Sequence, residues 1–133
     1  LFLRDREFPR AVSDFMESIP HERGGTATVR AGLASACRGL QDWREQIARR
    51  RSIIRSEPAL HERDLLRSHY LARAIERSLH QRGIAPEHAH TLAALAVTCF
   101  DLAMDRWLEG PSDLSLEDAL TAVWTDMQGW ING

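Results

Sequence analysis

Apolar residues recur at helical spacing along almost the whole chain, and the densest pattern lies at residues 91–107. The apolar positions of this segment cover well over half of a helical circumference instead of one stripe. A helix of this kind must be covered on more than one side. We expect one side to pack on the chain's own core and the other on a second copy of the chain. The segment is too short to span a bilayer, and Asp101 interrupts it.

The remaining apolar stripes predict an all-α protein. Amphipathic helices are expected at 8–19 and 29–40, followed by a shorter Arg-rich helix from the phase change near Trp43 to Arg55. A long helix follows, with its inner side at Leu66, Tyr70, Ile75 and Leu79, and the last stripe covers 116–131. No alternating strand pattern is present in the sequence. Residues 1–133 are therefore expected to form one domain, a single bundle of five to six helices.

Local signals place several helix ends. Pro58 and Pro86 suit the first turns of the long and the apolar helix. Gly83 suits the left-handed position after the long helix, with Ile84 contacting Leu79 as in a Schellman motif. Ser115, followed three residues later by Asp118, resembles a capping box at the start of the last helix.

Composition excludes several classes of protein. The chain is 44% hydrophobic and 27% charged with a net charge of −2, which is ordinary for a globular domain and gives nucleic acid no global attraction. Cys37 and Cys99 form neither a C-x-x-C motif nor a disulfide framework, and no signal peptide is visible, so a cytoplasmic location is expected. Residue 1 is Leu and not Met, so we expect that it is not the native start of the protein.

The chain offers little chemistry for catalysis or metal binding. The Arg49–Arg51 run points in three directions around a helix and is interpreted as a solvated face. The spacings His88–His90 and His61–His69 do not suit one-turn chelation. Asp101 and Asp105 share one helix face with Thr98, and this face is interpreted as a polar strip exposed to solvent. We expect no enzyme, no metal and no cofactor, although distant side chains could still converge.

Four segments resemble the C-terminal regulatory domain of TetR-family transcription repressors. They are LFLRDREFPRAVSDF at 1–15, RRRSIIRSEPALHERDLLRSHYLARAIERSL at 49–79, AALAVTCFDLAMDRWLEG at 93–110 and LEDALTAVW at 116–124. The I-x-x-x-P-x-L pattern spans Ile54 to Leu60, and the W-L-x-G pattern uses Trp107, Leu108 and Gly110. The resemblance implies a ligand-binding and dimerisation domain. It also implies that DNA is bound only through an N-terminal helix-turn-helix domain, which is missing from this chain.

Small residues where the helices should meet, such as Ala36, Cys37 and Ala74, predict enclosed space, and the resemblance adds a small apolar effector to fill it. Tyr70 would supply a hydroxyl and Arg73 a charge for a carboxylate or phosphate. The full candidate lining is Leu33, Cys37, Leu40, Ile54, Leu66, His69, Tyr70, Arg73, Leu95, Cys99 and Leu102. The simpler alternative is a closely packed core without a cavity.

The last two helices are expected to form a four-helix bundle with a second copy of the chain. The candidate interface residues are Phe100, Trp107, Leu120, Val123, Trp124 and Met127. Two further readings stay open at this point. The chain could be a free-standing helical dimer that binds or sequesters an apolar molecule, with no membrane partner, or it could be an enzyme.

Overall fold

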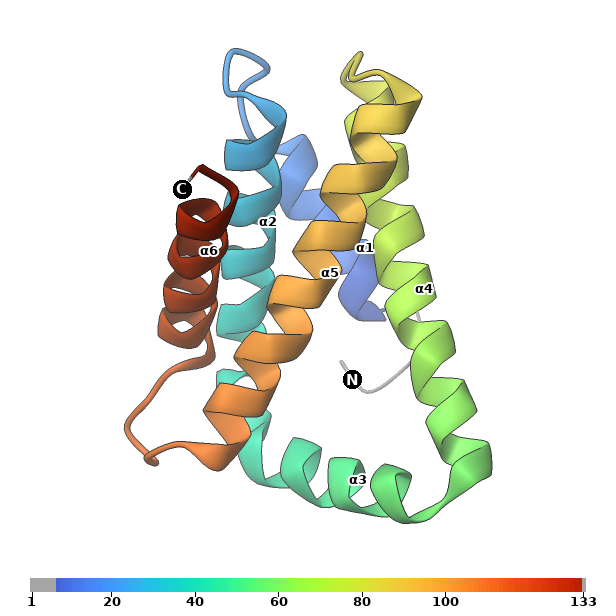
Figure 1. Cartoon of the computed structure of the whole chain (residues 1–133), viewed down its shortest axis with the longest axis vertical. Coiled ribbons are helices and arrows are strands. Elements are labelled where there is room, and N and C mark those ends of the chain that lie inside the picture. Colours follow the sequence, from blue (N-terminus) through green and yellow to red (C-terminus); the bar gives the residue numbers. More distant parts are fainter. Residues whose placement is uncertain (1–6, 133) are drawn as a thin grey trace.

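The computed structural model describes residues 7–132, and these residues form an all-α bundle without a strand (Figure 1). This confirms the predicted fold class. The elements are α1 (Glu7–Glu17), α2 (Gly25–Leu40), a short 3₁₀ turn η1 (Gln41–Trp43), α3 (Arg44–Ser56), α4 (Pro58–Gln81), α5 (Pro86–Glu109) and α6 (Leu116–Asn132).

The helices pack around one core. The neighbouring pairs are α4 with α5, α5 with α6, α2 with both α5 and α6, α1 with both α2 and α4, and α3 with α4. Helix α3 lies across one end of the bundle and connects α2 to α4 (Figure 1). The largest completely covered side chains come from α1, α2, α4, α5 and α6, and include Met16, Leu33, Ile75, Trp107 and Trp124.

Helix α1 crosses α2 very closely at Gly32. A Cβ atom at this position would lie 2.5 Å from Cγ of Met16 and 3.3 Å from the carbonyl oxygen of Val12. Any larger residue would therefore push the two helices apart or force Met16 to repack. Glycine is required here by the close approach, not by an unusual backbone angle.

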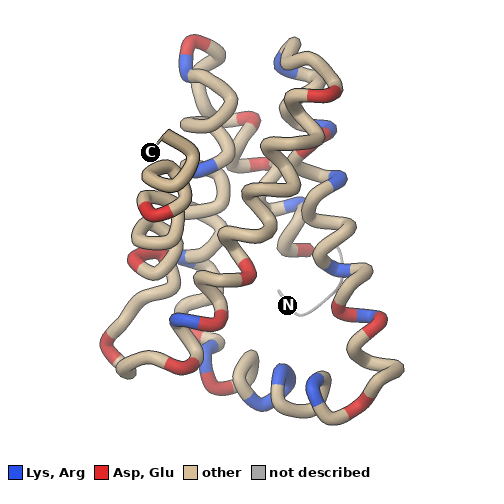
Figure 2. The backbone as a smooth tube through the Cα atoms, in the orientation of Figure 1, with Lys and Arg blue, Asp and Glu red and all other residues tan. Residues whose placement is uncertain are grey.

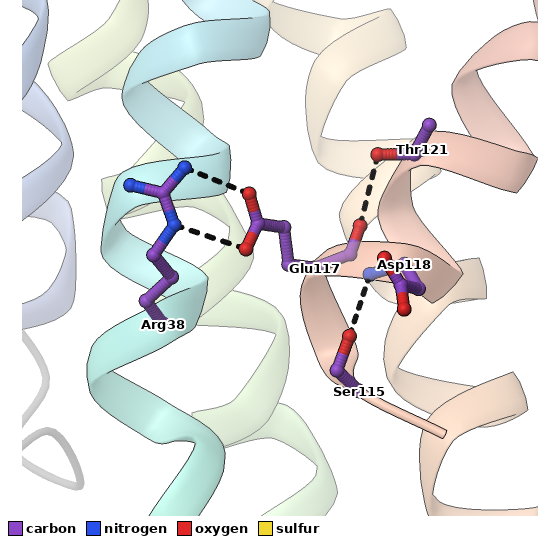
Figure 3. Close-up of polar contacts among 5 residues, drawn as sticks. All are labelled: Arg38, Ser115, Glu117, Asp118 and Thr121. Atoms are coloured by element: carbon purple, nitrogen blue, oxygen red, sulfur yellow. Dashed lines mark hydrogen bonds and ion pairs between the residues drawn. The ribbon is translucent and has the colours of Figure 1, made fainter. Parts of the chain in front are cut away.

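The predicted helix ends are confirmed. Gly83 has a φ of +89°, and the amide of Ile84 donates to the carbonyl oxygen of Leu79 at 3.2 Å, as a Schellman motif requires. Pro58 and Pro86 are the first residues of α4 and α5. Ser115 Oγ accepts a hydrogen bond from the Asp118 amide at 3.0 Å at the start of α6 (Figure 3).

Arginine side chains join helix ends that are distant in the sequence. Arg44, the first residue of α3, donates to the carbonyl oxygens of Trp107 at 3.0 Å and Gly110 at 3.1 Å, where α5 ends. Arg82, after α4, donates to the carbonyl oxygens of Ile19 at 3.0 Å and Pro20 at 2.9 Å, beyond α1. Arg82 also donates to the carbonyl oxygen of Met16 at 3.2 Å, so both arginines bind carbonyl groups in the last turn of a helix, where such groups lack intrahelical partners.

Helix α6 is also tied to α2 by an ion pair. Arg38 donates from Nε and Nη2 to the two carboxylate oxygens of Glu117 at 2.9 and 2.8 Å (Figure 3). The pair is largely exposed, so it orients the two helices more than it stabilises them. It also holds the pKa of the Glu117 carboxyl below its ordinary value.

The predicted inner side of α4 is wrong in its first half. The buried stripe is Leu71, Ile75, Ser78 and Leu79, whereas Leu66 is 51% exposed. Tyr70 is half-buried. In the first half of α4, beside α3, residues 61–66 are all exposed, so this half has no buried face and the buried stripe begins at Leu71.

The candidate dimer-interface residues lie inside one protomer, which corrects the sequence-based assignment. Trp107 and Trp124 are 0% exposed. Phe100 is half-buried and lies on a different side of α5. The apolar circumference of α5 is covered by α2, α4 and α6 of the same chain, so these residues do not need a second copy. The others that belong to this core are Leu120, Val123 and Met127.

Candidate ligand cavity

A cavity of about 330 Å³ lies where α3 crosses the end of the bundle. Helices α4 and α5 lie close together near the turn that joins them and diverge toward α3 (Figure 1). The start of α1 and the end of α2 complete the wall. A volume of this size is within the range of small-molecule sites in proteins.

Most of the cavity wall is apolar. Phe8 from α1 stacks on Phe100 from α5 with ring centroids 4.8 Å apart. This contact joins the first described helix directly to the cavity. The other apolar lining residues are Pro9, Leu40, Ile47, Ile54, Leu65, Leu71 and Met104.

Charged side chains interrupt this apolar wall. Arg50 and Arg51 come from α3, Asp64 and Arg67 from α4, and Asp101 from α5, with Ser68 beside them. Figure 2 shows several basic positions along α3, and both basic and acidic positions on the part of α4 that lies nearest α3. A mostly apolar cavity with a few convergent polar groups is typical of a binding site that orients its ligand.

The α3 arginines are partly neutralised by α5. Arg51 forms an ion pair with Asp105 through Nη2, and Arg55 lies 3.6 Å from the same carboxylate and 3.9 Å from Glu109. Burial is the largest cause that lowers the pKa of Arg51, and the charge of Arg55 adds to it. These ion pairs connect α3 to the second half of α5 beside the cavity.

Asp101 is the most perturbed carboxyl group of the cavity. Loss of solvation among the surrounding side chains is the main cause that raises its pKa to about 6, and repulsion by Asp64 adds to this effect. Attraction by Arg51 opposes both without cancelling them. The side chain still reaches solvent, because it borders an open cavity. Asp101 is therefore a titratable group within a ligand-sized space.

Two of the predicted pocket residues, Leu40 and Ile54, line this cavity. The others do not, which corrects the sequence-based site. Leu33, Cys37 and Cys99 belong to the closed core. Leu66, His69, Arg73 and Leu102 are exposed, and Tyr70 and Leu95 are half-buried outside the lining.

The two thiols are core groups. Burial, with a smaller contribution from Glu117, raises the pKa of Cys37 to about 12. Cys99 Sγ lies 3.2 Å from Met127 Sδ, between α5 and α6. The small residues near Cys37 thus allow close packing of helices and leave no space for a ligand.

Sequence reasoning missed the charged half of the cavity. One signal was present: positions 47, 50, 51 and 54 share one face of α3, and 64, 67, 68 and 71 share one face of α4. Each face mixes apolar and charged residues, as a cavity wall does. Such a mixture is also typical of a helix face that borders solvent. From the sequence alone, the Arg49–Arg51 run and Asp101 are therefore interpreted as facing solvent.

No family model and no curated protein matches this chain. Within residues 7–132, no helix has both the length and the apolar character needed to cross a bilayer. The same residues contain no group of three or more His, Cys, Asp or Glu side chains placed to hold a metal ion.

Proposed function

We propose that this chain is the effector-binding and dimerisation domain of a TetR-like transcriptional repressor. The observation that carries the proposal is the 330 Å³ cavity at the junction of α1, α3, α4 and α5. The helix order and the four resembling segments of the sequence support the same assignment. The effector would occupy the cavity, and its binding would alter DNA affinity in a helix-turn-helix domain of the same protein.

Ligand binding would act through α1. Phe8 of α1 stacks on Phe100 in the cavity wall, so a molecule that displaces the Phe8 ring would also shift the start of α1. Such a ligand changes DNA affinity only if it binds one arrangement of α1 better than another. A ligand would meet this condition if it fitted the cavity better with the Phe8 and Phe100 rings separated than with the rings stacked.

A cavity-filling substitution tests whether the space binds ligands. Ser68 is half-buried and lines the cavity, so Ser68→Trp is expected to occupy it and to weaken binding of the neutral fluorescent probe N-phenyl-1-naphthylamine by about tenfold or more. The probe is titrated by fluorescence.

Cys37→Trp provides the contrast to Ser68→Trp. It is expected to cost about 1–3 kcal/mol or more in urea unfolding, because Cys37 has no adjacent space. Unchanged probe affinity in a folded Ser68→Trp variant would contradict the ligand-binding role of the cavity.

The dimer would use the exposed surface of α5 and α6 around the Arg106–Asp126 hydrogen bond of 3.3 Å. Leu102 lies one turn before Arg106, and Ala122 one turn before Asp126, and both are exposed. The surface also carries Ala94, Thr98 and Thr125, whose small side chains let helices approach closely. Two such surfaces related by a two-fold axis would form an isologous interface.

Light scattering at micromolar concentration is expected to give about twice the chain mass of 15.1 kDa. Ala122→Arg is expected to reduce the mass to that of a monomer, because it places a charge at the centre of the interface. Ala59→Arg, at an exposed position in the first turn of α4, serves as the matched control and should remain dimeric. A monomeric wild-type protein, or a dimeric Ala122→Arg variant, would contradict this interface.

The regulatory role is tested on the protein encoded by the complete gene. A helix-turn-helix encoded upstream of Leu1, with operator binding that a cavity ligand weakens, is the expected result. Operator binding that is insensitive to any cavity ligand would overturn the assignment. An upstream region without such a motif would favour the free-standing apolar-binding dimer instead.

A further inference from the structure

A second open space adjoins the cavity between α3 and the first half of α4. It is a groove of about 480 Å³, and its wall is formed by side chains of these two helices alone. Arg50, Ile54 and Arg67 line both the groove and the cavity. The two spaces therefore meet at the same three side chains, and a ligand that passes them can occupy both.

The groove is basic. Four of its eight lining residues are arginines, namely Arg49 and Arg50 from α3 and Arg63 and Arg67 from α4, and none of the eight is acidic. Within residues 7–132, Arg49, Arg50 and Arg63 have neither a hydrogen bond nor an ion pair. Arg67 has an interaction of its own and is not counted with them. Three guanidinium groups in the groove are thus available to a ligand.

Charges of opposite sign are separated between the two spaces. Asp64 and Asp101 line the cavity and not the groove, whereas Arg49 and Arg63 line the groove and not the cavity. The glutamates at positions 45, 57 and 62 of the same segment are also outside the groove lining. A negatively charged group is therefore attracted to the groove and repelled by the carboxylates on the cavity side.

Apolar side chains connect the arginines to the cavity. Ile53 is 56% exposed among the groove arginines, and Leu60 of α4 also lines the groove. Ile54 is buried and borders both spaces. The aliphatic stems of the arginines add further apolar surface. The groove can thus contact a hydrocarbon chain beside the charged group that the guanidinium groups bind.

We infer that the ligand is an amphipathic organic anion, with its head group bound in the groove by Arg49, Arg50 and Arg63 and its apolar chain extending along Ile54 into the cavity. This inference rests on the proposed ligand-binding function and adds the chemical class of the ligand. Guanidinium groups bind carboxylates and phosphates through paired hydrogen bonds. Three of them match a doubly charged phosphate monoester better than a single carboxylate.

Three ligands with the same alkyl chain and different head groups test this inference. Octyl phosphate, octanoate and octanol are titrated into the full chain by isothermal calorimetry at pH 7.5 and constant ionic strength. Octyl phosphate is expected to bind about tenfold more tightly than octanol, with octanoate between them. Octyl phosphate should also displace N-phenyl-1-naphthylamine from the cavity, whereas inorganic phosphate, which has no apolar chain, should leave the probe bound.

A double variant, Arg49→Gln with Arg63→Gln, removes two of the head-group contacts. Both residues are exposed, so the fold should be retained, which circular dichroism verifies. The variant is expected to lose about tenfold in octyl phosphate affinity and to keep its octanol affinity. Arg73→Gln with Arg77→Gln is the matched control. It changes the net charge by the same amount at exposed positions of α4 outside both linings, and it should bind as the wild type does.

The outcomes distinguish the inference from the proposed function. Equal affinity for octyl phosphate and octanol would overturn the anion selection while leaving an apolar ligand site intact. Equal losses in the two double variants would overturn the groove as the head-group site, because only the net charge would then matter. Octyl phosphate that binds without displacing the probe would overturn the connection between groove and cavity. Absence of binding of the probe and of all three ligands would overturn both the inference and the ligand-binding role.

Discussion

Replacing Trp124 with alanine is expected to lower the free energy of unfolding by about 3–5 kcal/mol. Trp124 is 0% exposed on α6, where that helix packs against α2 and α5. Removing its indole leaves a large void that the surrounding helices cannot fill completely. A domain of this size has only about 5–15 kcal/mol of stability, so the variant loses a large share of it. Urea unfolding followed by circular dichroism measures the effect.

Trp130→Ala is the control for the same chemical change. Trp130 is on the same helix but is 72% exposed, so its truncation should change stability by less than about 0.5 kcal/mol. The pair also tests the corrected position of Trp124. Truncation of a residue in the core of one protomer lowers the free energy of unfolding at every protein concentration. If Trp124→Ala lowers the free energy of unfolding by less than about 1 kcal/mol, or lowers it only in dilute protein, Trp124 is not buried within one protomer.

Arg44→Met is expected to destabilise the bundle by about 2–3 kcal/mol. The substitution keeps much of the aliphatic stem but removes the guanidinium that donates to the carbonyl oxygens of Trp107 and Gly110. These carbonyl groups at the end of α5 would then lack donors in a part-buried position. Because the same guanidinium fixes the start of α3, the cavity should also lose ligand affinity.

Arg49→Met provides the comparison for Arg44→Met. Arg49 lies on the same helix and is exposed, so its replacement should be nearly neutral. Thermal unfolding measures both variants, and hydrogen exchange at the end of α5 locates the loosened region. If the two variants unfold at the same temperature, the contacts of Arg44 with α5 do not contribute to stability.

The helix ends could be predicted from the sequence because the signals for them are local. Gly83 adopts a positive φ that other residues rarely accept, and Pro58 and Pro86 open helices because they lack an amide hydrogen. Ser115 caps α6 through an oxygen three residues from its partner. Each of these effects acts within a few residues, so tertiary packing does not override it.

The covered face of each helix was harder to predict, because it depends on neighbours far away in the sequence. Leu66 and Leu71 are equally plausible core residues in the sequence of α4, yet Leu66 is exposed and Leu71 is buried. The apolar circumference of α5 correctly indicated that more than one neighbour covers it. The sequence could not show that three helices of the same chain are those neighbours.

The cavity was predicted in part, through Leu40 and Ile54. The error lay in attributing empty space to small residues. Ala36 and Cys37 are small because helices approach closely there, and they are fully packed. Space arises instead where α3 holds α4 and α5 apart, a feature of the topology. In the sequence, Asp101 cannot be distinguished from a solvated aspartate. Its raised pKa depends on burial and on the charges of Asp64 and Arg51, which only the fold brings near it.

The close crossing of α1 and α2 has a consequence for the divergence of related sequences. Because the space beside Gly32 is taken up by Met16 and by the backbone of Val12, position 32 cannot acquire a side chain independently. A residue larger than glycine at 32 requires a shorter one at 16, so the two positions should change together as the sequence drifts. Such paired substitution would keep α1 in place and preserve the position of Phe8 at the cavity.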